Sequence, residues 1–321
     1  MPPGKLRGPP LNDPLAGTAP IFKICPDGTA QLIGTGIWLT TSGHLLTAAH
    51  VIDDNIGPDG VDIGPICAVQ TLPDRRLLCR AFRRTDKHTR FDLALTETVA
   101  PQGMEGVATI AHMLTLEEPP CGARVHTHAF LSPEQEFTGE RYPGVTTFRF
   151  EGEGRILETS QTFAVRYMAR VGFGHVTGNY PEARDTVMLP FPCFQSDMPI
   201  YGANSGGPVF DHKGRVCGIN CSSYEGSDIS FHVPLKEMLS LWMQDVELIP
   251  EDPVPRRRSV LELGLAKRIG FDPPLRKILF PWYYRLLLWP YHQWLDACAR
   301  FRLELRQAVA KHAPDKEEAG K

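Results

Sequence analysis

The chain is 321 residues long, which allows two domains of average size or one large β domain with an extension. Charged residues make up 22% and hydrophobic residues 42%, an ordinary globular balance that excludes wholesale disorder. The formal net charge of −3 gives no general case for nucleic-acid binding, so no nucleic-acid partner is expected.

Charge is unevenly distributed along the chain. Residues 1–250 hold 20 Lys and Arg against 28 Asp and Glu, whereas residues 251–321 hold 14 against 9. The sequence therefore predicts an acidic body followed by a basic extension.

The first residues and the cysteines bear on the compartment. Residues 1–19 are rich in Pro and Gly and predict a flexible segment, with no apolar run of signal-peptide length. No charge-free stretch of about 18 apolar residues follows, which argues against a transmembrane helix. The 8 cysteines lack CxxC spacing and favour buried free thiols over a disulfide framework. We therefore expect a cytoplasmic protein.

Short apolar or alternating runs, separated by Gly, Pro, Asn and Asp, fill the next part of the chain. Such a pattern predicts an all-β barrel or sandwich. The runs expected to form strands include 32–41, 44–47, 66–71, 77–83, 124–130, 146–150, 162–170, 215–221 and 229–233.

Helical spacing appears only after these runs. Apolar residues recur every three or four positions after Pro234, from Leu235 to Val246. This spacing predicts a helix over 235–248 that closes the β body.

Three segments combine the side chains that amide hydrolysis requires, which are a nucleophile, a base and a group that orients the base. They are TAAHV at 47–51, FDLAL at 91–95 and NSGGPV at 204–209. A buried histidine or a turn serine is an ordinary alternative for each residue alone, but coincidence does not readily supply three such motifs.

These motifs resemble those of the trypsin-like serine peptidases, including the bacterial HtrA branch. The segments GRVCGIN at 214–220 and FHVP at 231–234 extend the resemblance, which covers about residues 20–250. It implies an all-β fold of two six-stranded antiparallel β-barrels with the active site in the cleft between them. The domains expected are thus a protease domain over 20–250 and a basic, aromatic-rich extension over 251–321.

The resemblance also assigns roles in the hydrolysis of peptide bonds. Ser205 is the nucleophile, His50 is the general base and then the general acid, and Asp92 fixes the tautomer of His50. The backbone N–H groups of Ala203 and Ser205 form the oxyanion hole. Cys221, Ser222 and Ser223 lie in the strand that pairs with an extended polypeptide substrate.

Two residues beside the serine depart from the family. Ala203 replaces a Gly whose backbone conformation costs a residue with a Cβ about 1 kcal/mol. We therefore expect an oxyanion hole that is poorly formed at rest and an activating protein partner. Asn204 replaces the Asp that pairs with a freed N-terminus in secreted trypsins, so activation by propeptide cleavage is not expected.

Two further features bear on specificity and metal binding. Asp197 or Asp228 would favour a basic substrate side chain, although a solvated loop carboxylate is the ordinary alternative. His126 and His128 share one face of an expected strand, but no spacing fixes a third ligand, so neither a metal nor another cofactor is expected.

The extension contains seven aromatic residues between 280 and 294, interrupted by Pro281 and Pro290. The segment 278–295 suits docking on the protease body or on a partner, and also a membrane interface. A non-catalytic peptide-binding module on a protease fold is the alternative function, and the intact set of His, Asp and Ser favours the enzyme.

Overall fold

The computed structural model describes residues 17–25, 29–55, 65–72, 77–100, 103–104, 106–132, 146–156, 159–224, 227–246 and 256–279. Contacts divide the chain into a unit of residues Met1–Asp272 and a second unit, Pro273–Lys321. The two units are described separately below.

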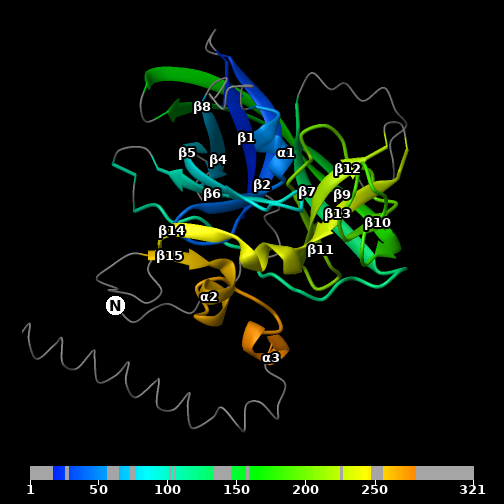
Figure 1. Ribbon diagram of the computed structural model, residues 1–321. Coiled ribbons are helices and arrows are strands. Elements are labelled where there is room, and N and C mark those ends of the chain that lie inside the picture. Colours follow the sequence, from blue (N-terminus) through cyan, green and yellow to red (C-terminus); the bar gives the residue numbers. More distant parts are fainter. Residues whose placement is uncertain are drawn as a thin grey trace, which may run out of the picture. The chain divides into compact units, whose positions relative to one another are not determined.

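Six antiparallel strands close the first barrel of the larger unit, in the order β1-β2-β3-β6-β5-β4 (Figure 1). Their bounds are β1 Thr18–Ile24, β2 Ala30–Trp38, β3 His44–Thr47, β4 Ile66–Thr71, β5 Leu77–Lys87 and β6 Ala94–Val99. The short helix α1, Ala49–Asp53, follows β3 directly. Strand β1 begins at Thr18, so the last two residues of the segment predicted to be flexible are ordered and buried.

The second sheet has seven strands in the order β10-β13-β12-β11-β7-β9-β8. Their bounds are β7 Arg124–Leu131, β8 Thr146–Ile156, β9 Thr159–Tyr180, β10 Cys193–Ser196, β11 Pro208–Phe210, β12 Val216–Ser223 and β13 Ser230–Pro234. Pairing between β10 and β9 closes six of these strands into a ring, and β8 pairs with β9 outside it. The predicted fold of two six-stranded antiparallel barrels is confirmed.

A shared core joins the two barrels. Phe22, Cys67 and Val69 of the first barrel form one buried apolar cluster with Phe130 and Tyr167 of the second. Burial of aromatic and aliphatic groups on this scale fixes the barrels against each other, which positions any site at their junction.

The predicted closing helix over 235–248 is wrong. The chain forms a short 3₁₀ helix, η1 Leu235–Ser240, and then a strand, β14 Trp242–Val246. From Leu241 to Gln244 the residues alternate between buried and exposed, which is the period of a strand. Strand β14 pairs with β15, Arg256–Ser259, and this pairing decides its conformation.

The larger unit continues beyond the expected domain boundary at residue 250. Helix α2, Val260–Leu265, begins with a capping box in which Ser259 and Glu262 bond each other's backbone N–H groups. Val260 and Leu263 are fully buried, and Leu114 N–H donates to Gly270 C=O at 3.0 Å. The described residues 256–272 are therefore part of the packed body.

The second unit is described only over residues 273–279, which include helix α3, Leu275–Leu279. Most of the aromatic segment 278–295 lies outside the described residues. None of the helices in the described part has both the length and the apolar character needed to cross a membrane.

Candidate active site

The pairing of β3 with β6 brings His50 and Asp92 together. In this pair Thr47 lies opposite Ala94, so the turn before β6 meets the start of α1. His50 Nδ1 and Asp92 Oδ2 are 2.7 Å apart, and the backbone N–H of His50 donates to Asp92 Oδ1 at 2.9 Å. Two bonds from one residue fix the carboxylate and the imidazole in a single relative orientation.

The electrostatics of this pair favour a charged imidazolium. Burial opposes the charge on His50, but the hydrogen bond and negative charge of Asp92, with the charges of Asp54 and Asp53, raise the pKa of His50 above 6.5. Burial likewise opposes the charge on Asp92, but His50 and a hydrogen bond from Cys221 lower the pKa of the carboxyl group. Asp92 stays ionised and holds Nδ1 of the His50 ring, so Nε2 is available for acid–base chemistry.

Ser205 lies in the loop between β10 and β11. Several hydrogen bonds fix the conformation of this loop. Asn204 N–H donates to Tyr201 C=O, and the Asn204 side chain accepts from Tyr201 N–H and donates to Phe130 C=O. Asn204 is 1% exposed. The amide that replaces the family's Asp thus holds the serine loop against β7 without an ion pair.

The serine loop also contacts the first barrel. Ser205 C=O accepts from Thr35 N–H at 2.9 Å, and the Thr35 hydroxyl donates to Ala203 C=O at 2.7 Å. Gly206 has φ +81°, and a Cβ there would lie 2.0 Å from Thr47 Oγ1. Glycine is therefore required at this position, because both the space and the backbone conformation exclude a side chain.

Ala203 adopts the conformation that the sequence indicated to be costly. Its φ is +67°, and the hydrogen bond between Asn204 N–H and Tyr201 C=O closes a turn of type II with Ala203 at the third position. The backbone N–H groups of Ala203 and Ser205 donate to no residue in the described part of the chain. Both N–H groups are thus free of any described acceptor.

Cys221 connects the serine to the aspartate. Ser205 Oγ donates to Cys221 C=O at 3.3 Å, and Cys221 Sγ donates to Asp92 Oδ2 at 3.0 Å. Burial, followed by the charge of Asp92, raises the pKa of the Cys221 thiol well above 9.0, so the sulfur stays protonated and remains a donor. The strand register shifts between Asn220 and Ser222, which makes Cys221 the extra residue of a β-bulge.

The thiol contact with Asp92 was missed from the sequence, which assigned Cys221 only to the substrate strand. The only sign of this contact in the sequence is that Cys221, in the expected substrate strand, carries a thiol that can donate a hydrogen bond. The bulge that aims the side chain depends on pairing with β13 and is not visible in the local pattern.

The remaining residues of the expected substrate strand have one open side. Ser222 and Ser223 pair with β13, whereas pairing of β12 with β11 ends at Ile219 and Pro208. Both serines are partly exposed. This edge offers backbone groups to an added strand.

The two candidate acidic specificity residues lie in different loops. Asp228 is exposed in the loop between β12 and β13. Asp197 accepts from His175 N–H, and its carboxylate lies 3.8 Å from His175 Nδ1. The carboxylate of Asp197 is thus engaged by a neighbouring strand.

His126 and His128 do lie near each other, with ring centroids 5.4 Å apart. Both rings pack against Phe210, at 5.0 Å and 4.8 Å. Among the described residues no group of three His, Cys, Asp or Glu side chains is arranged to hold a metal ion.

The model of a family described as "Trypsin-like peptidase domain" matches residues 34–219. A protein of Marinomonas sp. (strain MWYL1) named "Probable periplasmic serine endoprotease DegP-like" is 26% identical over 231 residues. The alignment covers 70% of this chain and 38% of that protein, so the chain spans much less than the full length of this relative.

Three solved structures are among those similar to this chain. Deg5 is 16% identical with a TM-score of 0.47, over 69% of this chain and 84% of that one. The MamO protease domain from Magnetospirillum magneticum is 15% identical with a TM-score of 0.43, over 69% and 93%. The HtrA-type protease AlgW with a decapeptide is 18% identical with a TM-score of 0.43, over 69% and 62%.

Proposed function

Because the chain belongs to the family of trypsin-like peptidase domains, we propose that it is a serine endopeptidase that uses Ser205, His50 and Asp92. The observation that carries the proposal is the pairing of His50 with Asp92 at 2.7 Å, joined to Ser205 through Cys221. A base held by a carboxylate, with a serine linked to the same carboxylate through Cys221, supports acyl transfer.

In the proposed mechanism, the hydroxyl of Ser205 turns from Cys221 C=O to His50 Nε2 and attacks the carbonyl carbon of the substrate. The proton of Ser205 passes to His50, and Asp92 stabilises the imidazolium. The proton then passes to the leaving amine, and an acyl-enzyme forms on Ser205. Water deprotonated by His50 attacks the ester, and release of the acid restores the enzyme.

We propose that the backbone N–H groups of Ala203 and Ser205 stabilise the oxyanion of each tetrahedral intermediate. Support comes from the absence of any other described acceptor for these two groups and from the positive φ of Ala203. The strain of about 1 kcal/mol at Ala203 disfavours this turn at rest. A substrate or activating protein that binds the formed hole would offset that strain.

The proposed substrate is a polypeptide bound as an extended strand. Ser222 and Ser223 would pair with it on the open side of β12, and Cys221 C=O would accept from its backbone. Asp197 is engaged by His175, and Asp228 stays a predicted contact for a basic substrate side chain.

Proteome-wide cleavage mapping tests the proposed function. Wild-type chain and Ser205→Ala are incubated with a denatured proteome, and new N-termini are identified by mass spectrometry. New termini that require Ser205 support the proposal. Identical termini in both samples, together with tight binding of unfolded peptides, would instead identify a non-catalytic peptide-binding module.

We propose that the segment 278–295 docks the enzyme on a protein or a membrane surface. Aromatic residues flanked by basic ones suit both interfaces. Liposome co-sedimentation of the full chain and of residues 1–272 distinguishes a membrane surface from a protein partner. Equal amounts of the two forms in the pellet would exclude binding to the membrane. The cytoplasmic location stays a prediction, which cell fractionation checks against the periplasm named for the Marinomonas relative.

A further inference from the structure

Two buried polar side chains behind the serine loop have no part in the proposed mechanism. Asn220 of β12 and His232 of β13 lie opposite each other in the β12–β13 pair, and both are fully buried. His232 Nδ1 lies 3.1 Å from Asn220 Oδ1, and His232 Nε2 lies 2.7 Å from Ser196 Oγ. Polar groups buried so completely are costly unless each is paired, so their arrangement is closely constrained.

The partners of Asn220 determine how its amide is oriented. Asn220 Nδ2 lies 2.8 Å from Thr127 Oγ1 and 3.3 Å from the carbonyl oxygen of Asn204. The carbonyl can only accept, and the hydroxyl of Thr127 already donates to Pro208 C=O at 2.7 Å. Both partners therefore require the NH₂ group, which leaves Oδ1 facing His232. Because Oδ1 can only accept, His232 Nδ1 is the donor, and burial lowers the pKa of His232 to about 3, so the ring is neutral.

The carbonyl that accepts from Asn220 belongs to the peptide between Asn204 and Ser205. The N–H of that peptide is the Ser205 donor proposed for the oxyanion hole. In a trans peptide the C=O and N–H groups point in opposite directions, so fixing one fixes the other. Gly207 N–H donates to the same carbonyl at 3.0 Å. Two donors on one oxygen therefore set the direction in which the Ser205 N–H points.

Backbone bonds and a glycine place Asn220 against this peptide. Gly206 N–H donates to Asn220 C=O, and Asn220 N–H donates to Gly207 C=O, both at 2.8 Å. A Cβ at Gly207 would lie 2.9 Å from the Asn204 carbonyl oxygen and 3.1 Å from Asn220 Nδ2. Glycine at position 207 thus leaves the space in which the amide and the carbonyl meet.

We propose that Asn220 is a positioning residue for the oxyanion hole and that His232 positions Asn220. The amide of Asn220 holds the Asn204 carbonyl so that the Ser205 N–H points toward the developing oxyanion. The bond from His232 keeps the amide from turning over. A donor oriented in advance stabilises the transition state without reorganising during the reaction. This inference rests on the proposed function, because only a peptidase that acts through Ser205 uses this N–H.

Asn220→Leu keeps the branched shape of the side chain and removes the amide. Loss of one oxyanion-hole donor lowers kcat by about 10²–10³-fold, and a misdirected N–H keeps part of its effect, so kcat/KM should fall about ten- to a hundredfold. In a Ser205→Ala background, the same substitution should change the Kd of the uncleaved peptide by less than about twofold, since the loss lies in the transition state. Equal losses in kcat/KM and in peptide binding would overturn the proposal, because Asn220 would then support only the shape of β12.

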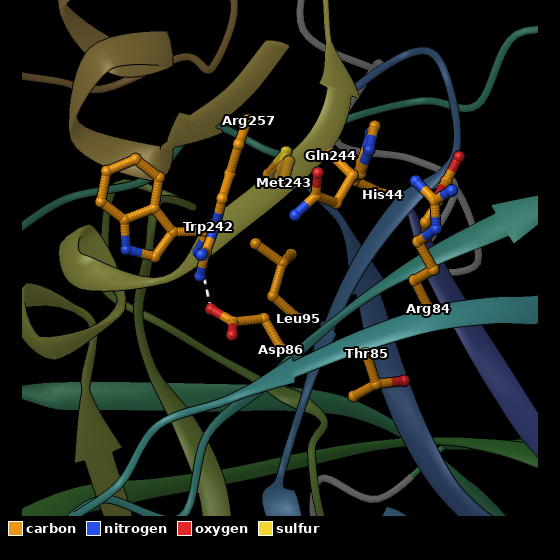
Figure 2. Close-up of a pocket in the computed structure, with 10 residues that line it drawn as sticks. His44, Arg84, Thr85, Asp86, Leu95, Trp242, Met243, Gln244 and Arg257 are labelled. Atoms are coloured by element: carbon orange, nitrogen blue, oxygen red, sulfur yellow. Dashed lines mark hydrogen bonds and ion pairs between the residues drawn. The ribbon is translucent and has the colours of Figure 1, made fainter.

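Met243→Ala is the matched control for lost stability. Met243 is buried and lines a cavity of about 270 Å³ between the first barrel and the β14–β15 pair (Figure 2). None of the hydrogen bonds of Asn220 and His232 involves it. Its melting temperature should fall while kcat/KM, measured well below melting, stays that of the wild type. Equal losses of kcat/KM in Met243→Ala and Asn220→Leu would show that Asn220 acts through stability alone.

His232→Asn and His232→Leu test the second link, and they give a reading of the same bond if Asn220→Leu does not fold. The shorter amide places an NH₂ group near the position of Nδ1 and can donate to Asn220, whereas leucine cannot. Both variants remove the ring nitrogen that faces Ser196, so that loss is common to them. We expect kcat/KM within about threefold of the wild type for His232→Asn and about tenfold lower for His232→Leu. Equal losses in the two would contradict positioning by His232.

The wild-type activity separates this inference from the proposed function. A folded wild type without cleavage that depends on Ser205 would overturn both. An active wild type in which Asn220→Leu keeps full kcat/KM would overturn the role of Asn220 and leave the peptidase in place.

Discussion

Ala203 sets the state of the proposed oxyanion hole. A non-glycine residue at φ +67° is strained by about 1 kcal/mol, and the same turn relaxes when its peptide flips and turns the N–H away. The hydrogen bond from Thr35 to Ala203 C=O fixes the peptide that follows Ala203, whereas the N–H of Ala203 belongs to the peptide that precedes it. The strain at Ala203 therefore determines how much of the resting protein is competent.

Ala203→Gly should raise basal peptidase activity. Glycine removes the strain, and about 1 kcal/mol corresponds to an increase of up to about fivefold in kcat/KM. A fluorogenic peptide taken from the cleavage map measures it, with Gly206→Ala as a variant that should lose activity. No gain in the glycine variant would mean that the hole is already fully populated.

The protonation of His50 should determine the acidic limb of the profile of kcat/KM against pH. The enzyme needs a neutral His50, and the pKa of His50 is raised, so kcat/KM should rise with pH through a midpoint above 6.5. Asp54→Asn removes a negative charge that favours the imidazolium, and should move the midpoint to lower pH by a few tenths of a unit. The measurement is kcat/KM against pH at low ionic strength.

Glu182→Gln is the matched control for this shift. Glu182 is exposed and is not among the charges that raise the pKa of His50. Its profile should overlay that of the wild type. A midpoint that is the same in the Asp54 and Glu182 variants would show that the limb does not report His50.

Strand β2 connects the two barrels at the serine loop through one buried side chain. The Thr35 hydroxyl donates to Ala203 C=O and accepts from Phe130 N–H, and Thr35 is fully buried. Valine has nearly the same shape without the hydroxyl, so Thr35→Val leaves both groups unpaired at a cost of about 1–3 kcal/mol each. We expect a lower melting temperature and reduced kcat/KM, both restored largely in Thr35→Ser. Equal stability of the valine and serine variants would contradict this role.

The strands and helices also show how far the sequence could predict the structure. The bounds of β3 and β4 were predicted correctly, because each strand is a compact run bordered by turn residues. Strands β10 and β11 are four and three residues long and were missed, since so short a stretch carries no period. The predicted helix over 235–248 failed because pairing with β15 overrode the local spacing.

In the candidate site, too, some residues could be predicted from the sequence and others could not. His50, Asp92 and Ser205 could be proposed from the sequence because each lies in a local motif of contiguous residues. The thiol of Cys221 and the hydroxyl of Thr35 act between strands far apart in the chain. Their contacts follow from register and bulges, which no single stretch of sequence specifies.

At the scale of the whole molecule, the packed body and the charge boundary do not coincide. Charge changes sign near residue 250, whereas the larger unit extends to Asp272. The intervening residues include β15 and α2, which add the buried side chains of Val260 and Leu263 to the body. The described residues 256–272 therefore contribute to stability rather than forming part of a separate extension.

Truncation distinguishes these two boundaries. Residues 1–272 should melt within a few degrees of the full chain. Residues 1–250 lose at least two buried aliphatic side chains, worth about 2–5 kcal/mol each, and should melt more than about 10 °C lower. Circular dichroism on both forms measures the difference, and equal melting temperatures would place the boundary at residue 250.

Labelling with a fluorophosphonate probe tests the nucleophile most directly. The probe forms a covalent bond with a serine that is activated by a base and an oxyanion hole, and mass spectrometry identifies the modified residue. We predict a single adduct on Ser205, lost in Ser205→Ala and strongly reduced in His50→Ala. Absence of labelling in folded wild-type chain incubated with its cleavage-map peptides, or labelling that persists in Ser205→Ala, would contradict a serine peptidase acting through Ser205.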